Sequence, residues 1–117
     1  MNQSDKTYVY ALIRRDIPLS QQLVQVGHAA LEAGRHHYGQ DDPIASFIVL
    51  EVPDREALMT AAGKLQKNGI EHTVFFEPDF GMGQSALASR PVSGKERHVF
   101  RRWPLWREQG AAVPATA

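Results

Sequence analysis

Side chains that can carry out acid–base chemistry occur in three stretches well apart in the chain. His28 lies among polar residues of a predicted helix, where an imidazole can act as a base or as a hydrogen-bond donor near neutral pH. Glu77 and Asp79 follow one predicted strand, and Asp16 follows another. Carboxylates at such positions can orient a water molecule or accept a ribose hydroxyl. The structural alternatives are a histidine that ties its helix to a loop and acids that form turns.

The hydrophobic pattern predicts the elements that must bring these residues together. Apolar stretches rich in β-branched and aromatic residues predict four strands, and amphipathic stretches predict two helices. The strands span 7–13, 44–52, 71–76 and 84–89, and the first helix spans 21–37. The second helix runs between a cap at Asp54 and a C-terminal stop at Gly69. Strands that alternate with helices pair in parallel, whereas the last strand follows a short loop and is expected to pair antiparallel. The predicted fold class is α/β, a single-domain sandwich with a four-stranded mixed sheet and flanking helices.

Ligand sites in open α/β sheets lie beyond the carboxyl ends of the strands. We therefore expect the three carboxylates to meet His28, Gln21 and Gln25 at one edge of the sheet. The first helix is expected to begin at an N-cap, Ser20, and the second at Asp54. A side of small apolar residues is expected to pack on the sheet (Leu23, Val26, Gly27, Ala30, Ala33 and Gly34). A polar side is expected to face away from it (Gln21, Gln25, His28, Glu32, Arg35 and His36).

The composition is that of a globular protein and excludes several classes. The 117 residues suit one domain, which we assign to 1–109, and residues 110–117 are expected to be disordered. The sequence has no cysteine, which excludes disulfides and thiolate chemistry. No apolar run approaches the roughly 20 residues of a membrane-spanning helix. The polar start does not resemble a secretory signal, so a cytoplasmic location is expected.

The basic residues are unevenly distributed, although the formal net charge is zero. Residues 90–107 contain six basic residues and one acidic residue. Within them, the segment 95–107 is also aromatic, so Arg101 and Arg102 are candidates to contact phosphates and Trp103 to stack on a base. The alternatives are a solvated surface segment for the charges and packing in the core or between subunits for the tryptophan.

The sequence lacks the common cofactor and metal motifs. The Gly81-Met82-Gly83 stretch has neither a third glycine nor a following helix, so it is not a dinucleotide fingerprint. His28 and Glu32 are four residues apart, but nothing completes a metal site around them. We therefore expect no cofactor and no metal.

Several stretches together resemble the type II peptidyl-tRNA hydrolases. Residues 11–16 (ALIRRD) followed by 25–30 (QVGHAA) are similar to that family's first strand and helix. Residues 47–58 are similar to its second strand and helix, and 69–72 to its approach to the third strand. Residues 77–81 (EPDFG) and 85–88 (SALA) are similar to a bacterial and phage branch. The resemblance covers about Tyr8 to Pro91.

The resemblance implies an α/β sandwich, usually dimeric, that cleaves the ester between a peptide and the 3′ end of tRNA without a metal. It implies that Glu77 or Asp79 orients a water, with His28 as base or donor. Gln21 and Ser85 would then bond the ester carbonyl or the terminal ribose. Gln21 stands where many members have a lysine, so Arg14 or Arg15 would supply the positive charge. The substrate-binding set is completed by Asp16, Gln25, Arg101, Arg102 and Trp103.

Two other functions stay open at this point. The first is a catalytically impaired member of the same fold that binds RNA or a protein, as the missing lysine suggests. It predicts binding of tRNA without turnover. The second is a small-molecule regulatory domain, which predicts no salt-dependent affinity for RNA.

Overall fold

The computed structural model describes residues 6–108, and these fold in the predicted order of strands and helices. The elements are β1 (Tyr8–Arg14), α1 (Leu19–His37), β2 (Ser46–Val52), α2 (Arg55–Lys67), β3 (His72–Glu77), η2 (Asp79–Gly81), β4 (Gly83–Ser89) and η3 (Gly94–Arg102). The tail 110–117, predicted to be disordered, lies outside the described residues. No helix within 6–108 is both long and apolar enough to cross a membrane.

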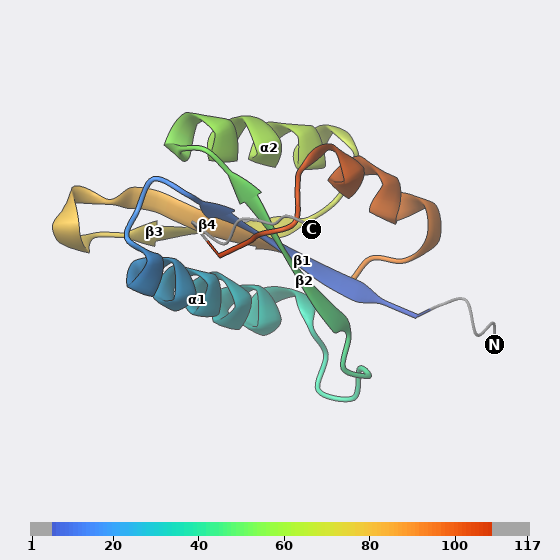
Figure 1. Cartoon of the computed structure of the whole chain (residues 1–117). Coiled ribbons are helices and arrows are strands. Elements are labelled where there is room, and N and C mark those ends of the chain that lie inside the picture. The colour runs from blue at the N-terminus through green and yellow to red at the C-terminus, as the bar shows by residue number, and fades with distance from the viewer. Residues whose placement is uncertain (1–5, 109–117) are drawn as a thin grey trace.

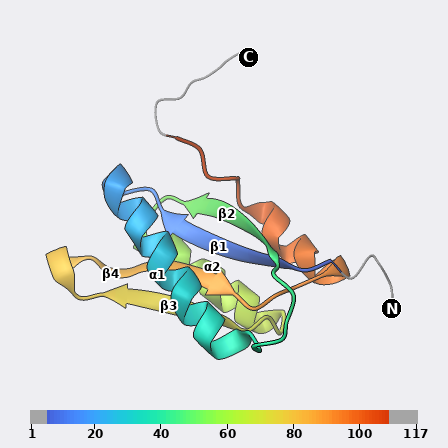
Figure 2. The same cartoon turned by 90° about the horizontal axis from the view of Figure 1, so that it is seen from below.

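The strands form one mixed sheet in the order β2-β1-β4-β3, which confirms the predicted α/β class. β1 pairs with β2 in parallel and with β4 antiparallel, and β3 pairs antiparallel with β4. Helix α1 covers one face of the sheet, and α2 and η3 cover the other (Figure 1). Seen from below, α1 lies across the sheet (Figure 2). The central strand β1 is nearly continuously apolar because both of its faces are covered.

Two apolar clusters fill the spaces on either side of the sheet. The α2 face is filled around Leu12 and Leu87, together with Leu58 and Leu65 from the helix. The α1 face is filled around Ile13 and by small residues (Ala11, Ala29, Ala33, Ala86 and Ala88). Successive residues of β1 therefore serve opposite clusters. The small residues let α1 approach the sheet closely.

The buried side of α1 differs from the predicted one. Gln22 and Gln25 are buried along with Ala29 and Ala33, whereas Leu23 and Leu31 are exposed. Gln22 donates to the carbonyl oxygen of Ile17 at 2.9 Å, and Gln25 bonds residues of β3 and β4. Because these amides find partners, their burial carries no unsatisfied polar group. A hydrophobicity pattern counts both glutamines as polar, and it gives no information about hydrogen-bond partners that are distant in the sequence.

The two predicted helix caps have different outcomes. The Asp54 carboxylate accepts the backbone N–H of Ala57 at 2.9 Å, so this cap is confirmed. Gly69, with a φ of 72°, follows the C-cap of α2 and confirms the predicted stop. The Ser20 cap is wrong, because α1 begins at Leu19 after Pro18 and has no side-chain cap. Proline fixes φ near the value that a helix start requires, and α1 begins two residues earlier than a cap at Ser20 allows.

Removing the cap of α2 is expected to cost more than removing the hydroxyl in α1. Asp54→Ala leaves the Ala57 N–H without its acceptor and is expected to lower the free energy of unfolding by about 1 kcal/mol. Ser20→Ala, the matched control, is expected to change it by less than about 0.5 kcal/mol. Urea unfolding followed by circular dichroism measures both. A larger loss for Ser20→Ala than for Asp54→Ala contradicts the assignment of the caps.

The segment after β4 passes from one face of the sheet to the other. Phe100 in η3 stacks on Tyr10 with ring centroids 3.9 Å apart. The following residues run along the outer edge of β2, where Glu51 donates its N–H to Pro104 and Trp106 donates its N–H to Val49. The Trp106 indole then donates to Gln22 of α1 at 2.7 Å. This segment covers part of an edge strand whose backbone would otherwise be open.

Candidate active site

A buried hydrogen-bond network joins α1 to β3 and β4 on the α1 face of the sheet. The Gln25 amide nitrogen donates to Oε1 of Glu77 at 2.8 Å, and the Ser85 hydroxyl donates to the Gln25 amide oxygen at 2.6 Å. Gln25 also donates to the amide oxygen of Gln21 at 3.3 Å. Four predicted site residues from stretches more than 50 positions apart therefore meet at one place.

A β-bulge turns Ser85 toward this network. Phe75 pairs with Ala86 and Phe76 pairs with Gln84, so Ser85 is an extra residue in β4. The bulge breaks the alternation of side chains, and Ser85 points to the α1 face together with Ala86. Ser85 is fully buried and its hydroxyl is used by Gln25. We therefore assign it to holding Gln25 in place, rather than to the direct substrate contact that the resemblance implies.

Glu77 is held as a carboxylate. The hydrogen bond from Gln25, then the backbone N–H of Asp79 and the nearby His28, lower its pKa below the ordinary 4.5. A lowered pKa means that the ionised form stabilises the fold above pH 4.5, and that this contribution is lost as the pH falls through the lowered value. Glu77 is 9% exposed, so its carboxylate is positioned as a hydrogen-bond acceptor at the surface of the network. A group so easily deprotonated is a weak base and suits the orientation of a water.

The His28 ring stacks on Phe75, with centroids 4.5 Å apart and planes 4° apart. Stacking uses the face of the imidazole and leaves the nitrogens on its edge free to bond other groups. His28 is exposed, so those nitrogens are accessible from solvent. Sequence reasoning missed Phe75, although its alternation with Phe76 along β3 already places one of the two rings on each face. The structure therefore gives His28 a fixed support beside Glu77.

Asp79 is bonded to the network, whereas Asp16, which was expected at the same edge, is bonded to Arg14 instead. The Asp79 backbone N–H donates to Glu77 at 3.1 Å, and its side chain is exposed. Asp16 instead binds the guanidinium of Arg14 at 2.9 Å, and this hydrogen bond lowers the pKa of Asp16. Arg14 also donates to the carbonyl oxygens of Met82 and Gln84 at 2.7 and 2.9 Å. Asp16 and Arg14 therefore brace the β3–β4 loop.

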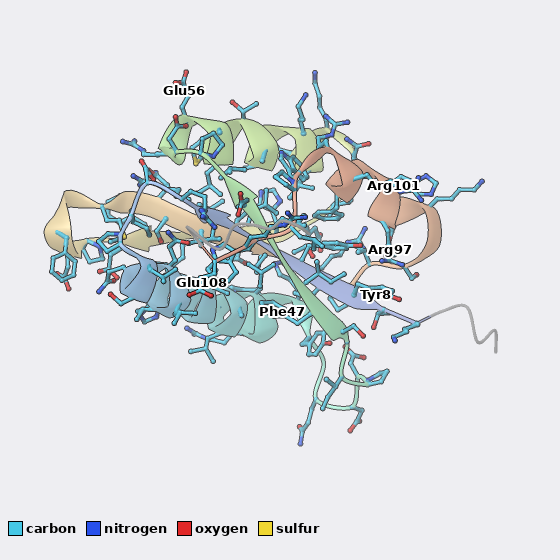
Figure 3. All side chains as sticks on the ribbon, in the orientation of Figure 1. Tyr8, Phe47, Glu56, Arg97, Arg101 and Glu108 are labelled. Carbon is cyan, nitrogen blue, oxygen red and sulfur yellow. The ribbon has the colours of Figure 1, made fainter. Side chains whose placement is uncertain are left out.

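The remaining basic residues of the predicted site are not brought to His28. Arg15 pairs with Glu51 at 2.9 Å and lies over the Trp106 ring. Arg101 and Arg102 are exposed at the end of η3. Arg101 lies on the opposite side of the sheet from α1 (Figure 3). Trp103 packs edge-on against Phe100 in the α2-face cluster. These residues would contact a substrate bound at His28 only if that substrate extended around the edge of the sheet to its other face.

A hollow in the described part of the chain lies apart from the network. Its volume is about 810 Å³, and it lies between the start of α2 and the segment around Trp103. Its walls carry both acidic and basic side chains, Glu56 and Arg102 among them. We place the candidate site at the network because acid–base groups converge there. Among residues 6–108, no cluster of three or more metal-ligating side chains occurs.

Comparison with known proteins establishes the fold. No family model matches the chain, and no curated protein is similar to it. Among solved structures, a protein of unknown function from Agrobacterium tumefaciens strain C58 superposes with a TM-score of 0.66. The alignment covers 87% of this chain and 98% of that protein, at 12% identity. Identity this low shows a common architecture and carries no information about the reaction.

Proposed function

We propose that the protein hydrolyses the ester bond between a peptidyl or acyl group and the 3′ end of tRNA. The observation that carries the proposal is the Gln25–Glu77–Ser85 network with His28 beside it. The resemblance to type II peptidyl-tRNA hydrolases assigns these same residues to the site. The fold and the absence of cysteine are compatible with hydrolysis that uses a water as nucleophile.

In the proposed reaction, Glu77 accepts a hydrogen bond from the attacking water and fixes its direction. His28 takes a proton from that water as its oxygen bonds the ester carbonyl carbon. The bond between that carbon and the ribose oxygen then breaks, and the proton passes from His28 to the ribose oxygen. Gln21 accepts from Gln25 through its amide oxygen, so its N–H groups are left to donate to the carbonyl oxygen.

A second candidate function is a binding module of the same fold that has lost turnover. One observation favours it: the guanidinium groups of Arg14 and Arg15 are engaged with carbonyl and carboxylate oxygens. Neither arginine is therefore free to replace the family lysine, at whose position Gln21 stands. The predicted homodimer stays a prediction.

Release of free tRNA from a model peptidyl-tRNA tests the proposal. The wild-type protein is expected to turn the substrate over. Glu77→Gln is expected to be about tenfold slower or more, because an amide has only one acceptor oxygen and cannot bond both the water and Gln25 as the two carboxylate oxygens do. Circular dichroism checks that both proteins are folded. Folded wild-type protein without turnover would remove the hydrolase proposal. Salt-dependent tRNA binding in that case would support the binding module.

A further inference from the structure

Phe80, at the tip of the β3–β4 hairpin, combines a strained backbone with an exposed apolar side chain. Its φ is 61°, in the left-handed region that bulky side chains rarely adopt. Its side chain is 80% exposed. The hairpin tip projects beyond the helices in both views (Figures 1 and 2). The fold therefore accepts strain at a position where the phenyl ring gains almost no burial.

The loop that carries Phe80 is fastened on both sides. Before Phe80, the Asp79 N–H is bound by the Glu77 carboxylate. After it, Met82 is buried in the α1-face cluster and its carbonyl oxygen accepts from Arg14 at 2.7 Å. Gly81 also has a positive φ of 62°, a conformation that glycine adopts without strain. These supports hold the backbone at Phe80 in place, so its side chain is directed into solvent from a fixed point of the loop.

An aromatic ring held out in solvent by a fastened backbone is suited to stacking on a flat partner. The loop backbone does not have to be ordered when such a ring binds, so that part of the entropy cost of binding is absent. A single exposed apolar residue is common and needs no explanation. The backbone of Phe80 is what separates it from the other exposed side chains, because strained residues cluster at ligand contacts.

The charges beside Phe80 restrict the kind of flat partner. Asp79 is its neighbour in the chain, and the ionised Glu77 lies 3.1 Å from the Asp79 nitrogen. These carboxylates repel a phosphate and accept hydrogen bonds from hydroxyl groups. Two guanidinium groups lie at the loop's base. Arg14 already binds Asp16 and two backbone carbonyls, and the Arg55 side chain lies beside Gly83. The carboxylates next to Phe80 itself favour an uncharged ring with hydroxyl groups, which is the chemistry of a nucleoside.

We propose that Phe80 is a stacking platform for a nucleobase, and that a free ribose hydroxyl of the same nucleoside donates to Glu77 or Asp79. The identity of this nucleoside rests on the proposed function, under which it is the 3′-terminal nucleoside of tRNA. The ester is attached to that ribose. Stacking on Phe80 therefore sets the ester beside the carboxylate that orients the water.

Fluorescence anisotropy of a labelled RNA trinucleotide, cytidine–cytidine–adenosine, measures this contact without requiring turnover. Phe80→Asn is expected to raise the Kd about tenfold or more, because a base gains that much from an aromatic platform. Phe80→Trp is expected to keep the wild-type Kd. Asparagine tolerates the left-handed conformation, so the urea midpoint of Phe80→Asn is expected to stay the same or rise.

Phe76→Asn is the matched control, because Phe76 is also an exposed aromatic residue but lies in an extended strand. Its Kd is expected to equal that of the wild type. The platform is overturned if Phe80→Asn binds as tightly as the wild type, if the wild type does not bind the trinucleotide, or if Phe80→Asn has a lower urea midpoint. If binding depends on Phe80 but the protein has no turnover, the platform is supported and the hydrolase proposal is removed. If the protein has turnover but binding does not depend on Phe80, the hydrolase proposal is supported and the platform is removed.

Discussion

His28→Ala is expected to hydrolyse a model peptidyl-tRNA roughly a hundredfold more slowly than the wild type, or slower still. The imidazole is the group at the site that can take a proton from water and return it to the leaving oxygen. Glu77 cannot replace it, because its hydrogen bonds lower its pKa and make it a poor base. The rate constant is measured under single turnover, so that product release does not mask the chemical step.

Two further variants separate the chemistry of His28 from its packing. His28→Phe keeps a flat ring to stack on Phe75 but has no nitrogen on its edge, so it is expected to be as slow as His28→Ala and as stable as the wild type. His36→Ala removes another exposed histidine of α1, 3.7 Å from Glu32, and is expected to keep the full rate. A His28→Phe protein with the wild-type rate would remove the imidazole from the mechanism.

The fold was predictable because its signals are local. The apolar run of β1, the Asp54 cap and the Gly69 stop each depend on a few neighbouring residues, and all three are as expected. Which side of α1 is buried was not predictable, because Gln25 is buried through hydrogen bonds to residues 52 and 60 positions away. Burial of a polar side chain depends on where its partners are, and composition along one helix does not contain that information.

The candidate site was predictable as a set of residues but not as a geometry. His28 and Glu77 were expected at one edge and the family resemblance added Ser85, yet only the bulge in β4 turns Ser85 toward Gln25. One extra residue in one strand changes which face a side chain occupies, and no local motif marks it. Phe80 is a similar case, because its strained φ arises from how the loop is fastened at Glu77 and Met82.

Leu12→Ala is expected to lower the free energy of unfolding by about 2–5 kcal/mol. Leu12 is fully buried at the middle of the sheet, paired with Leu50 on one side and Leu87 on the other. Its side chain fills the α2-face cluster, so truncation leaves a cavity that fixed strands on both sides cannot close. The free energy of unfolding of a domain of this size is about 5–15 kcal/mol, so this one substitution is expected to remove a large part of it.

Leu31→Ala removes the same atoms from a different environment and is the matched control. Leu31 is 69% exposed on the outer side of α1, so its truncation is expected to change the free energy of unfolding by less than about 0.5 kcal/mol. Urea unfolding of the two variants therefore tests the orientation of α1 as well as the core. The sequence pattern places Leu12 in an apolar strand and puts Leu31 on neither predicted side of the first helix. The buried polar network accounts for why α1 turns Leu31 to solvent. Equal losses for the two variants would mean that Leu31 is covered in solution, and would contradict the exposed face of α1.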